Sequence, residues 1–361
     1  MLESLTNQLA AAKSLSEDQV WLAVEQLVDE AVAATVKADF LSAFARKGET
    51  VEEIAAFARA LRKKSVQPPV DPETRARGIL DVVGTGGDRM NTFNISTTVA
   101  ILCAAAGVAV AKHGNRAVTS QVGSADVPDA LGIRIDLPPI EAARSLRERH
   151  FAFFFAPAYH PAFKHIAPAR KLCAERGQRT IFNILGPLLN PAQPDALLVG
   201  VSRPELCEPL GRVLQSLGVR RAMVASGGLR RAQADGQSRP SDAVHASAFL
   251  DELSTLGDNT IAEFYQERGF AASVLATDSF PLQTATLSDL VGGDRQTNAT
   301  IVRRLLHGEE RGPKRDAVLL NAAAALFVAG RTRTMAEGWE LAADVIDGGL
   351  ALKKLAELTE Q

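Results

Sequence analysis

The sequence is poor in cysteine and contains no long apolar run. Its three cysteines, Cys103, Cys173 and Cys207, are far apart in a chain of 361 residues, so neither a disulfide framework nor a zinc site is expected, and a reducing compartment is favoured. The longest apolar runs, at 99–111 and 318–330, fall short of the ~18 residues that a membrane span needs. The N-terminus lacks the basic and apolar regions of a signal peptide. We therefore expect a cytoplasmic protein without a membrane partner.

An excess of charge of one sign is also absent. Forty Lys and Arg residues stand against 42 Asp and Glu residues, which leaves a net charge of −2. No overall field therefore attracts nucleic acid, and we expect no nucleic-acid partner. Apolar residues make up 46% of the chain, which is enough for a substantial core, and the length suggests two domains at roughly 100–200 residues each.

The first seventy residues carry the periodicity of helices. Ser16 with Gln19, and Thr50 with Glu53, have the spacing of capping boxes, and apolar residues follow both pairs at helical intervals. The proline-rich stretch 67–72 then breaks the pattern, because proline removes a backbone donor and fixes φ. We therefore expect a small all-helical domain at 1–72 and a larger domain at 73–361.

From residue 73 onward, short apolar runs alternate with helical segments, for example 96–106 and 204–217, and two more helices are expected after Asp316. This alternation is typical of an α/β domain with a central, mostly parallel sheet, whose ligands bind beyond the carboxyl ends of the strands. The polar stretch 229–248 is expected to be a surface insertion. The expected strands are 79–83, 108–111, 151–155, 180–184, 197–201 and 222–225.

The strongest local signal follows the first expected strand, in the segment GTGGDRMNTFNIST at 84–97. Its glycines let the backbone approach a ligand, and Ser96 and Thr97 suit the start of a helix, whose N-terminus favours anions. The segment is not a Rossmann fingerprint, because Arg89 replaces the third glycine, and no Walker-type Gly-Lys-Ser/Thr follows. We interpret it as an anion-binding loop of another type.

A second polar loop, KHGNRAVTS at 112–120, follows the next expected strand and leads to Gly123-Ser124. Lys112 offers a compact positive charge and Arg116 a planar fork, and both suit phosphate. Two such loops at successive strand ends predict one binding site for a polyanion. His113 is a candidate general base or, as we favour, a residue of the site wall.

An adjacent acidic pair, Asp251-Glu252, follows the polar insertion. Mg²⁺ prefers one or two carboxylates together with phosphate oxygens, so this pair is a candidate magnesium site. Asp81, Asp88 and Asp126 are competing candidates. His160 and His165 lack the HExxH spacing of a zinc protease.

Together these motifs resemble the anthranilate phosphoribosyltransferase family over nearly the whole chain. The resemblance implies a helical domain hinged to a larger α/β domain, a homodimer formed through the helical domain, and a reaction in tryptophan biosynthesis. In that reaction 5-phosphoribosyl 1-diphosphate and anthranilate give N-(5-phosphoribosyl)anthranilate and pyrophosphate. The segments that carry the resemblance are 84–97, 112–120, FAPAYHPAFKHIAPAR at 155–170, RTIFNILGPLLNP at 179–191 and LDELST at 250–255.

The resemblance also implies roles for individual residues, without a general acid or base. Gly84, Asn115 and Arg170 are expected to contact anthranilate. Ser96, Asp251 and Glu252 are expected to bind magnesium, two ions per subunit. The expected contacts of the phosphoribosyl donor are Gly84, Gly87, Asp88, Thr92, Asn94, Ile95, Ser96, Thr97, Lys112, His113, Gly114, Asn115, Arg116, Ala117, Val118, Thr119, Ser120 and Ser124.

Two alternatives share parts of this pattern. A pyrimidine nucleoside phosphorylase of the same fold also pairs a glycine-rich anion loop with a sugar site, but the KHGNR segment and Arg170 argue against it. A non-catalytic relative that binds nucleic acid would need a basic surface, against which the net charge argues. The sequence between 227 and 249 departs from the family pattern, because the polar insertion separates the acidic pair from the preceding strand.

Overall fold

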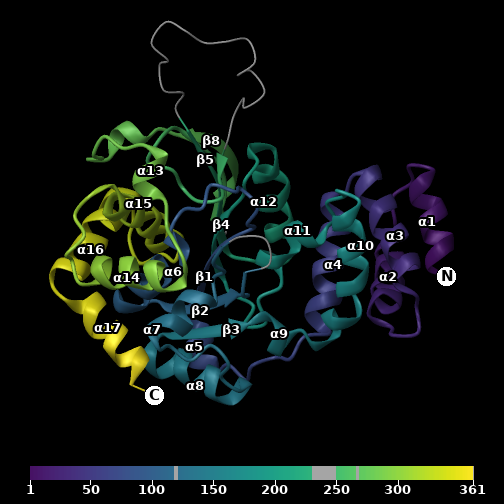
Figure 1. Cartoon of the computed structure of the whole chain (residues 1–361), viewed down its shortest axis with the longest axis horizontal. Helices are drawn as coiled ribbons and strands as arrows, with labels where there is room; N and C mark the ends of the chain where they lie inside the picture. Colours follow the sequence, from purple (N-terminus) through teal and green to yellow (C-terminus); the bar gives the residue numbers. More distant parts are fainter. Residues whose placement is uncertain (118–120, 230–248, 266–267, 361) are drawn as a thin grey trace, which may run out of the picture.

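The computed structural model describes residues 1–117, 121–229, 249–265 and 268–360, and Figure 1 shows a helical lobe beside a larger α/β lobe. The helical lobe contains α1 (Leu2–Ala10), α2 (Glu17–Val28), α3 (Ala34–Lys47) and α4 (Val51–Lys63). Both predicted capping boxes are present, at the start of α2 and of α4. Phe40, Phe44 and Phe57 pack ring against ring in its core.

A later segment of the chain also belongs to the helical lobe. Helix α10 (Ala167–Glu175) packs against α3 and lies beside α4 in Figure 1. Two contacts tie the segments together: Lys37 on α3 donates to the carbonyl oxygen of His165 at 2.9 Å, and the Sγ atom of Cys173 on α10 lies 3.5 Å from the carbonyl oxygen of Ala38. The lobe is therefore built from two stretches of sequence.

The α/β lobe is built on an eight-stranded sheet with the order β3-β2-β1-β4-β5-β7-β8, in which β6 pairs with β5. Strands β1 to β5 run parallel, whereas β6, β7 and β8 extend the sheet in antiparallel fashion. The predicted α/β class with a mostly parallel sheet is confirmed. The strands are β1 (Ile79–Gly84), β2 (Ala109–Gly114), β3 (Phe151–Phe155), β4 (Ala196–Gly200), β5 (Arg221–Gly228), β6 (Phe249–Leu250), β7 (Asn259–Tyr265) and β8 (Arg268–Leu275).

Helices cover both faces of this sheet. Alternate residues of a strand point to opposite faces, and accordingly Leu198 on β4 packs into the cluster around α6, whereas Leu197 and Val199 pack toward α12 and the helical lobe. The helices of the lobe are α5 (Pro72–Arg77), α6 (Ile95–Ala105), α7 (Asp126–Leu131), α8 (Pro139–Arg149), α9 (Ala156–Tyr159), α11 (Phe182–Leu185), α12 (Cys207–Ser216), α13 (Leu287–Leu290), α14 (Arg295–Leu306), α15 (Pro313–Val328), α16 (Met335–Asp347) and α17 (Leu350–Thr359).

The structure corrects several predictions. The strand predicted at 180–184 is instead the short helix α11, because an apolar run of this length also suits one buried helical turn. Three helices rather than two occupy the C-terminal segment, since Gly348 and Gly349 separate α16 from α17. The predicted insertion at 229–248 lies, beyond Leu229, outside the described residues. No helix in the described ranges is both long and apolar enough to cross a membrane.

Removing one capping box tests how much this local contact stabilises the helical lobe. The Thr50 hydroxyl accepts a hydrogen bond from the Glu53 backbone N–H at 3.2 Å, and the Glu53 carboxylate accepts one from the Thr50 N–H at 2.9 Å. Thr50→Ala should lower the free energy of unfolding by about 1 kcal/mol, because a cap of this kind is lost. Urea unfolding measures the change. Thr50→Ser keeps the hydroxyl and should retain most of the stability; equal losses in both variants would contradict the capping role.

Candidate active site

The first predicted loop begins at the carboxyl end of β1, and its first positions favour glycine. Gly86 and Gly87 have φ values of 73° and 85°, a region that favours glycine. At Gly84, a Cβ atom would lie 2.3 Å from Oδ2 of Asp251. The loop can therefore approach the acidic pair closely, and the Gly86 N–H donates to that same oxygen at 2.6 Å.

The loop ends at the N-terminus of α6. The N-cap residue is Asn94, not Ser96 or Thr97 as the sequence suggested, because Ser96 and Thr97 already lie within the first turn. The Ser96 N–H donates to the Glu252 carboxylate at 3.2 Å. The first turn of α6 thus points one backbone donor at the acidic pair, and a helix N-terminus favours such an anion.

The second predicted loop leaves β2, the parallel neighbour of β1, at the same edge of the sheet. Lys112 at its start is buried, and its Nζ atom donates to the Val82 carbonyl at 2.6 Å and lies 3.4 Å from the Ser96 hydroxyl. Burial lowers the pKa of Lys112, whereas the nearby charges of Asp81, Glu252 and Asp251 oppose this shift. The two loops are therefore adjacent.

The acidic pair follows β6 and lies across the ends of β1 and β4. A Cβ atom at Gly200, the last residue of β4, would lie 1.6 Å from the Asp251 carbonyl oxygen, so glycine makes this crossing possible. Loss of water raises the pKa of Asp251, and the neighbouring charges of Asp88 and Glu252 raise it further. Loss of water also raises the pKa of Glu252, against the effect of Lys112. Mutual repulsion of the three carboxylates therefore contributes to the raised pKa values of Asp251 and Glu252.

A row of rings leads from the second loop to Arg170. The rings of His113 and His160 are 5.2 Å apart, His160 and Phe163 are 5.1 Å apart, and Phe163 and Phe182 are 5.7 Å apart. The Arg170 guanidinium lies over the Phe182 ring at 5.2 Å. Burial lowers the pKa of His113 to about 3 and that of His160 to about 4, so both imidazoles are neutral at pH 7.

Comparison with known proteins adds to this geometry. The α/β domain of a glycosyl transferase family matches residues 76–241 and 234–352, and the helical bundle domain of such a family matches residues 3–65. An anthranilate phosphoribosyltransferase from Petrotoga mobilis is 41% identical over 360 residues, which cover 100% of this chain and 96% of the relative. The chain belongs to the anthranilate phosphoribosyltransferase family.

Solved structures of the family superpose along the whole chain. The anthranilate phosphoribosyltransferase from Thermus thermophilus has a TM-score of 0.84 and 38% identity, with 98% of each chain covered. The enzyme from Saccharomyces cerevisiae in complex with PRPP and Mg has a TM-score of 0.83 and 26% identity, with 99% of this chain and 97% of that chain covered. The yeast enzyme has also been solved with 4-fluoroanthranilate.

The residues expected from the family resemblance fall into distinct groups. The described contacts bring together Gly84, Asp88, Ser96, Lys112, Asp251 and Glu252. Ile95 and Thr97 are buried side chains, Thr92 forms an isolated bridge with Val291, and Gly114 packs against the Ser124 hydroxyl. Arg170 lies apart on α10, at the end of the ring row. Val118, Thr119 and Ser120 lie outside the described residues.

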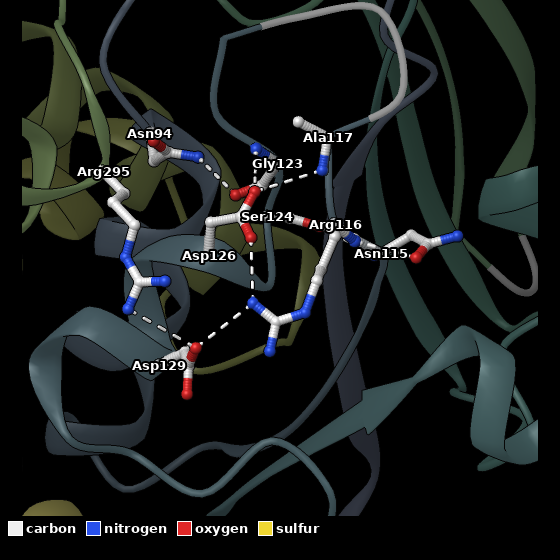
Figure 2. A network of polar contacts seen from close by, with 9 residues as sticks. All are labelled: Asn94, Asn115, Arg116, Ala117, Gly123, Ser124, Asp126, Asp129 and Arg295. Atoms are coloured by element: carbon white, nitrogen blue, oxygen red, sulfur yellow. Dashed lines mark hydrogen bonds and ion pairs between the residues drawn. The ribbon is translucent and has the colours of Figure 1, made fainter.

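Two features of the site had no counterpart in the sequence prediction. Phe182 was placed on a strand, but it lies on α11 and completes the ring row beneath Arg170. Arg116 was expected to meet phosphate, but its guanidinium pairs with Asp126 and Asp129 (Figure 2). No local sequence motif indicates the contact of Phe182 with Arg170 or that of Arg116 with its acids, because the partners come from different elements.

Adding a methyl group at Gly84 tests whether activity requires the close approach of the first loop to the acidic pair. Gly84→Ala should lower kcat/KM at least tenfold, because the Asp251 carboxylate has to leave its place beside Gly86. Gly269→Ala is the matched control, since a Cβ atom there meets nothing within 4 Å. Steady-state kinetics measure both variants. Wild-type turnover in Gly84→Ala would contradict the close approach.

Proposed function

We propose that this chain transfers the 5-phosphoribosyl group from 5-phosphoribosyl 1-diphosphate to anthranilate, releasing pyrophosphate, in tryptophan biosynthesis. The observation that carries the proposal is the meeting of two polar loops and an acidic pair at one edge of the sheet, bridged by Lys112, Ser96 and Asp251. Membership of the anthranilate phosphoribosyltransferase family supports it over the full length of the chain.

In this proposal the donor lies between the first loop and the second. The glycine loop and the N-terminus of α6 face its phosphates, as the positive end of a helix dipole favours. Asn115 and Ser124 form the opposite wall: the Asn115 N–H donates to the Ser124 hydroxyl at 3.2 Å. Lys112, on the strand that leads into the second loop, bonds to Val82 on β1 and to Ser96 on α6 and so joins that strand to the first wall.

The carboxylates fit magnesium rather than a metal held by protein alone. Among the described residues, no group of three or more His, Cys, Asp and Glu side chains could hold a metal ion, and Mg²⁺ is typically held by one or two carboxylates together with substrate phosphates. We assign Ser96, Asp251 and Glu252 as its ligands, with two ions per subunit. Bound Mg²⁺ would neutralise charge that develops on the departing pyrophosphate.

Anthranilate is proposed to lie along the ring row, between Asn115 and Arg170. The Arg170 guanidinium would bind its carboxylate, a charge-assisted contact of about 1.5–3 kcal/mol. The bond from the anomeric carbon to pyrophosphate breaks, the bond to the amine nitrogen forms, and the nitrogen loses a proton. Because an aryl amine is neutral at pH 7, positioning and electrostatics supply most of the catalysis, and neutral His113 and His160 serve as walls.

The proposal includes an assembly and a location. We assign the homodimer interface to the helical lobe, as the resemblance to the family implies. All three cysteines are buried free thiols, which suits the reducing cytoplasm.

Omitting one component at a time tests the reaction. Anthranilate fluorescence should fall only when the chain, 5-phosphoribosyl 1-diphosphate and Mg²⁺ are all present, and excess EDTA should stop the change. Phosphate with thymidine should give no product. Thymidine cleavage would instead support a nucleoside phosphorylase, and salt-dependent DNA binding without turnover would support a non-catalytic relative.

Replacing Arg170 tests the acceptor end. Arg170→Ala should raise KM for anthranilate about tenfold or more, since roughly 1.4 kcal/mol of carboxylate binding is lost, and KM for the donor should change little. Arg176→Ala, beyond the end of the same helix, is the control, because Arg176 pairs only with Asp39 among the described contacts. An unchanged KM for anthranilate in Arg170→Ala removes this residue from the acceptor site.

Neutralising the acidic pair tests the metal ligands. Asp251→Asn together with Glu252→Gln keeps the size of both side chains but removes their charge, so magnesium-dependent turnover should be abolished. Asp258→Asn, an exposed acid in the same segment, should retain activity. Turnover as a function of Mg²⁺ concentration is the measurement. Normal turnover in the double variant would show that other acids bind the metal.

A further inference from the structure

Asp126 is an acid that the proposed chemistry does not use, although it lies in the middle of the second loop's contacts. It is the first residue of α7, and its side chain is 14% exposed. One carboxylate oxygen accepts hydrogen bonds from two backbone groups, the Gly123 N–H at 2.8 Å and the Ala117 N–H at 3.1 Å. The other oxygen lies 3.1 Å from Nη1 of Arg116. Figure 2 shows these contacts converging on the one side chain.

The contacts of Asp126 join the two ends of the loop to each other. Residue 117 follows the end of β2, and residue 123 precedes α7. A Cβ atom at Gly123 would lie only 2.3 Å from the Ala117 nitrogen, so the chain segments touch where the carboxylate binds them. The Ala125 N–H also donates to the Asn115 carbonyl at 3.1 Å. The position of Asn115 thus depends on the segment that begins α7.

The same segment is tied to the first loop. The side-chain amide of Asn94, the N-cap of α6, donates to the Gly123 carbonyl at 3.4 Å, and Asn298 on α14 donates to the side-chain oxygen of Asn94 at 3.0 Å. Gly123 therefore links both walls of the proposed donor site. A group that fixes Gly123 to Ala117 therefore helps to hold the second loop in its contact with Asn94.

The charges of this network are balanced locally. Arg116 pairs with Asp126 and with Asp129, and Arg295 on α14 lies 3.6 Å from Asp129. Burial alone would raise the pKa of Asp126, but the hydrogen bonds from Gly123 and Ala117 and the pairing with Arg116 outweigh it and hold that pKa below its ordinary value. The carboxylate is therefore charged at pH 7, and the positive charge of Arg116 is committed to it.

We propose that Asp126 is a positioning residue for the phosphoribosyl donor, and that Arg116 acts through Asp126 rather than by contacting phosphate. The carboxylate fastens residues 117 and 123 and so holds Asn115 and Ser124 against the first loop. This inference rests on the proposed donor site, because it assigns a role to the support of one wall of that site. It changes the role of Arg116 from the one that the family resemblance implied.

Kinetics of two Asp126 variants test the proposal. Asp126→Ala should raise KM for 5-phosphoribosyl 1-diphosphate at least tenfold, and Asp126→Asn, which keeps one acceptor oxygen, about threefold. KM for anthranilate should rise less than the donor KM, because Asn115 depends on Asp126 but Arg170 does not, and the melting temperature of Asp126→Asn should stay near that of the wild type. Asp129→Asn is the control: Asp129 also pairs with Arg116 but accepts no bond from a backbone N–H in the described contacts, so it should change the donor KM less than twofold. Equal increases in both KM values, or an unchanged donor KM, would overturn the proposal.

A double variant separates the two roles of Arg116. If Arg116 acts through Asp126, then Arg116→Gln combined with Asp126→Asn should raise the donor KM no more than the larger single effect. Multiplying effects would show that Arg116 contacts the donor directly and would overturn the assignment. Calorimetric titration of 5-phosphoribosyl 1-diphosphate with Mg²⁺ into each variant measures the affinity for the donor without turnover. If the wild-type chain binds the donor but forms no product, the proposed reaction is wrong. The positioning role of Asp126 is tested separately, by the ranking of the variants in donor affinity.

Discussion

The parallel pairing of β1 with both β2 and β4 is the constraint on which the site depends. Parallel neighbours end at the same edge of a sheet, so the loops after β1 and β2 must leave side by side. Gly84 and Gly200 end β1 and β4 and leave space for Asp251 across them. Because β6 pairs with β5, the acidic pair is delivered to this same edge. Neither loop alone contains all the groups that the reaction needs.

The carboxylates at this edge of the sheet lie close enough together to repel one another. Asp88, Asp251 and Glu252 lie close together, and the positive charge of Lys112 lies near Asp251 and Glu252. Removing carboxylates from water is costly unless opposite charge is near. In the proposed reaction a divalent cation would relieve the repulsion of the acids, and the pyrophosphate of the donor would bind that cation. Arg116, which looks like a phosphate ligand in the sequence, is instead neutralised by its own acids.

Much of this arrangement could be predicted from the sequence, because the decisive signals are local. The capping residues Ser16 and Thr50, and the loop after β1, are each specified by neighbours within a few positions. Phe182 and Asp126 could not be placed in the same way. An apolar run such as 180–184 is compatible with strand or helix, and only packing against the helical lobe decides between them. The partners of Asp126 come from the β2 loop as well as from its own segment, and no periodicity records such contacts.

Hydrogen–deuterium exchange with and without ligands tests most directly whether one polyanion lies between the two loops. Addition of 5-phosphoribosyl 1-diphosphate with Mg²⁺ should slow amide exchange in residues 84–97 and in residues 112–117 together, at the same ligand concentration. Exchange on the outer strand β8 should not change, which provides an internal reference. Protection of only one of the two loops at saturating donor would contradict the account, because the donor would then not be enclosed by both.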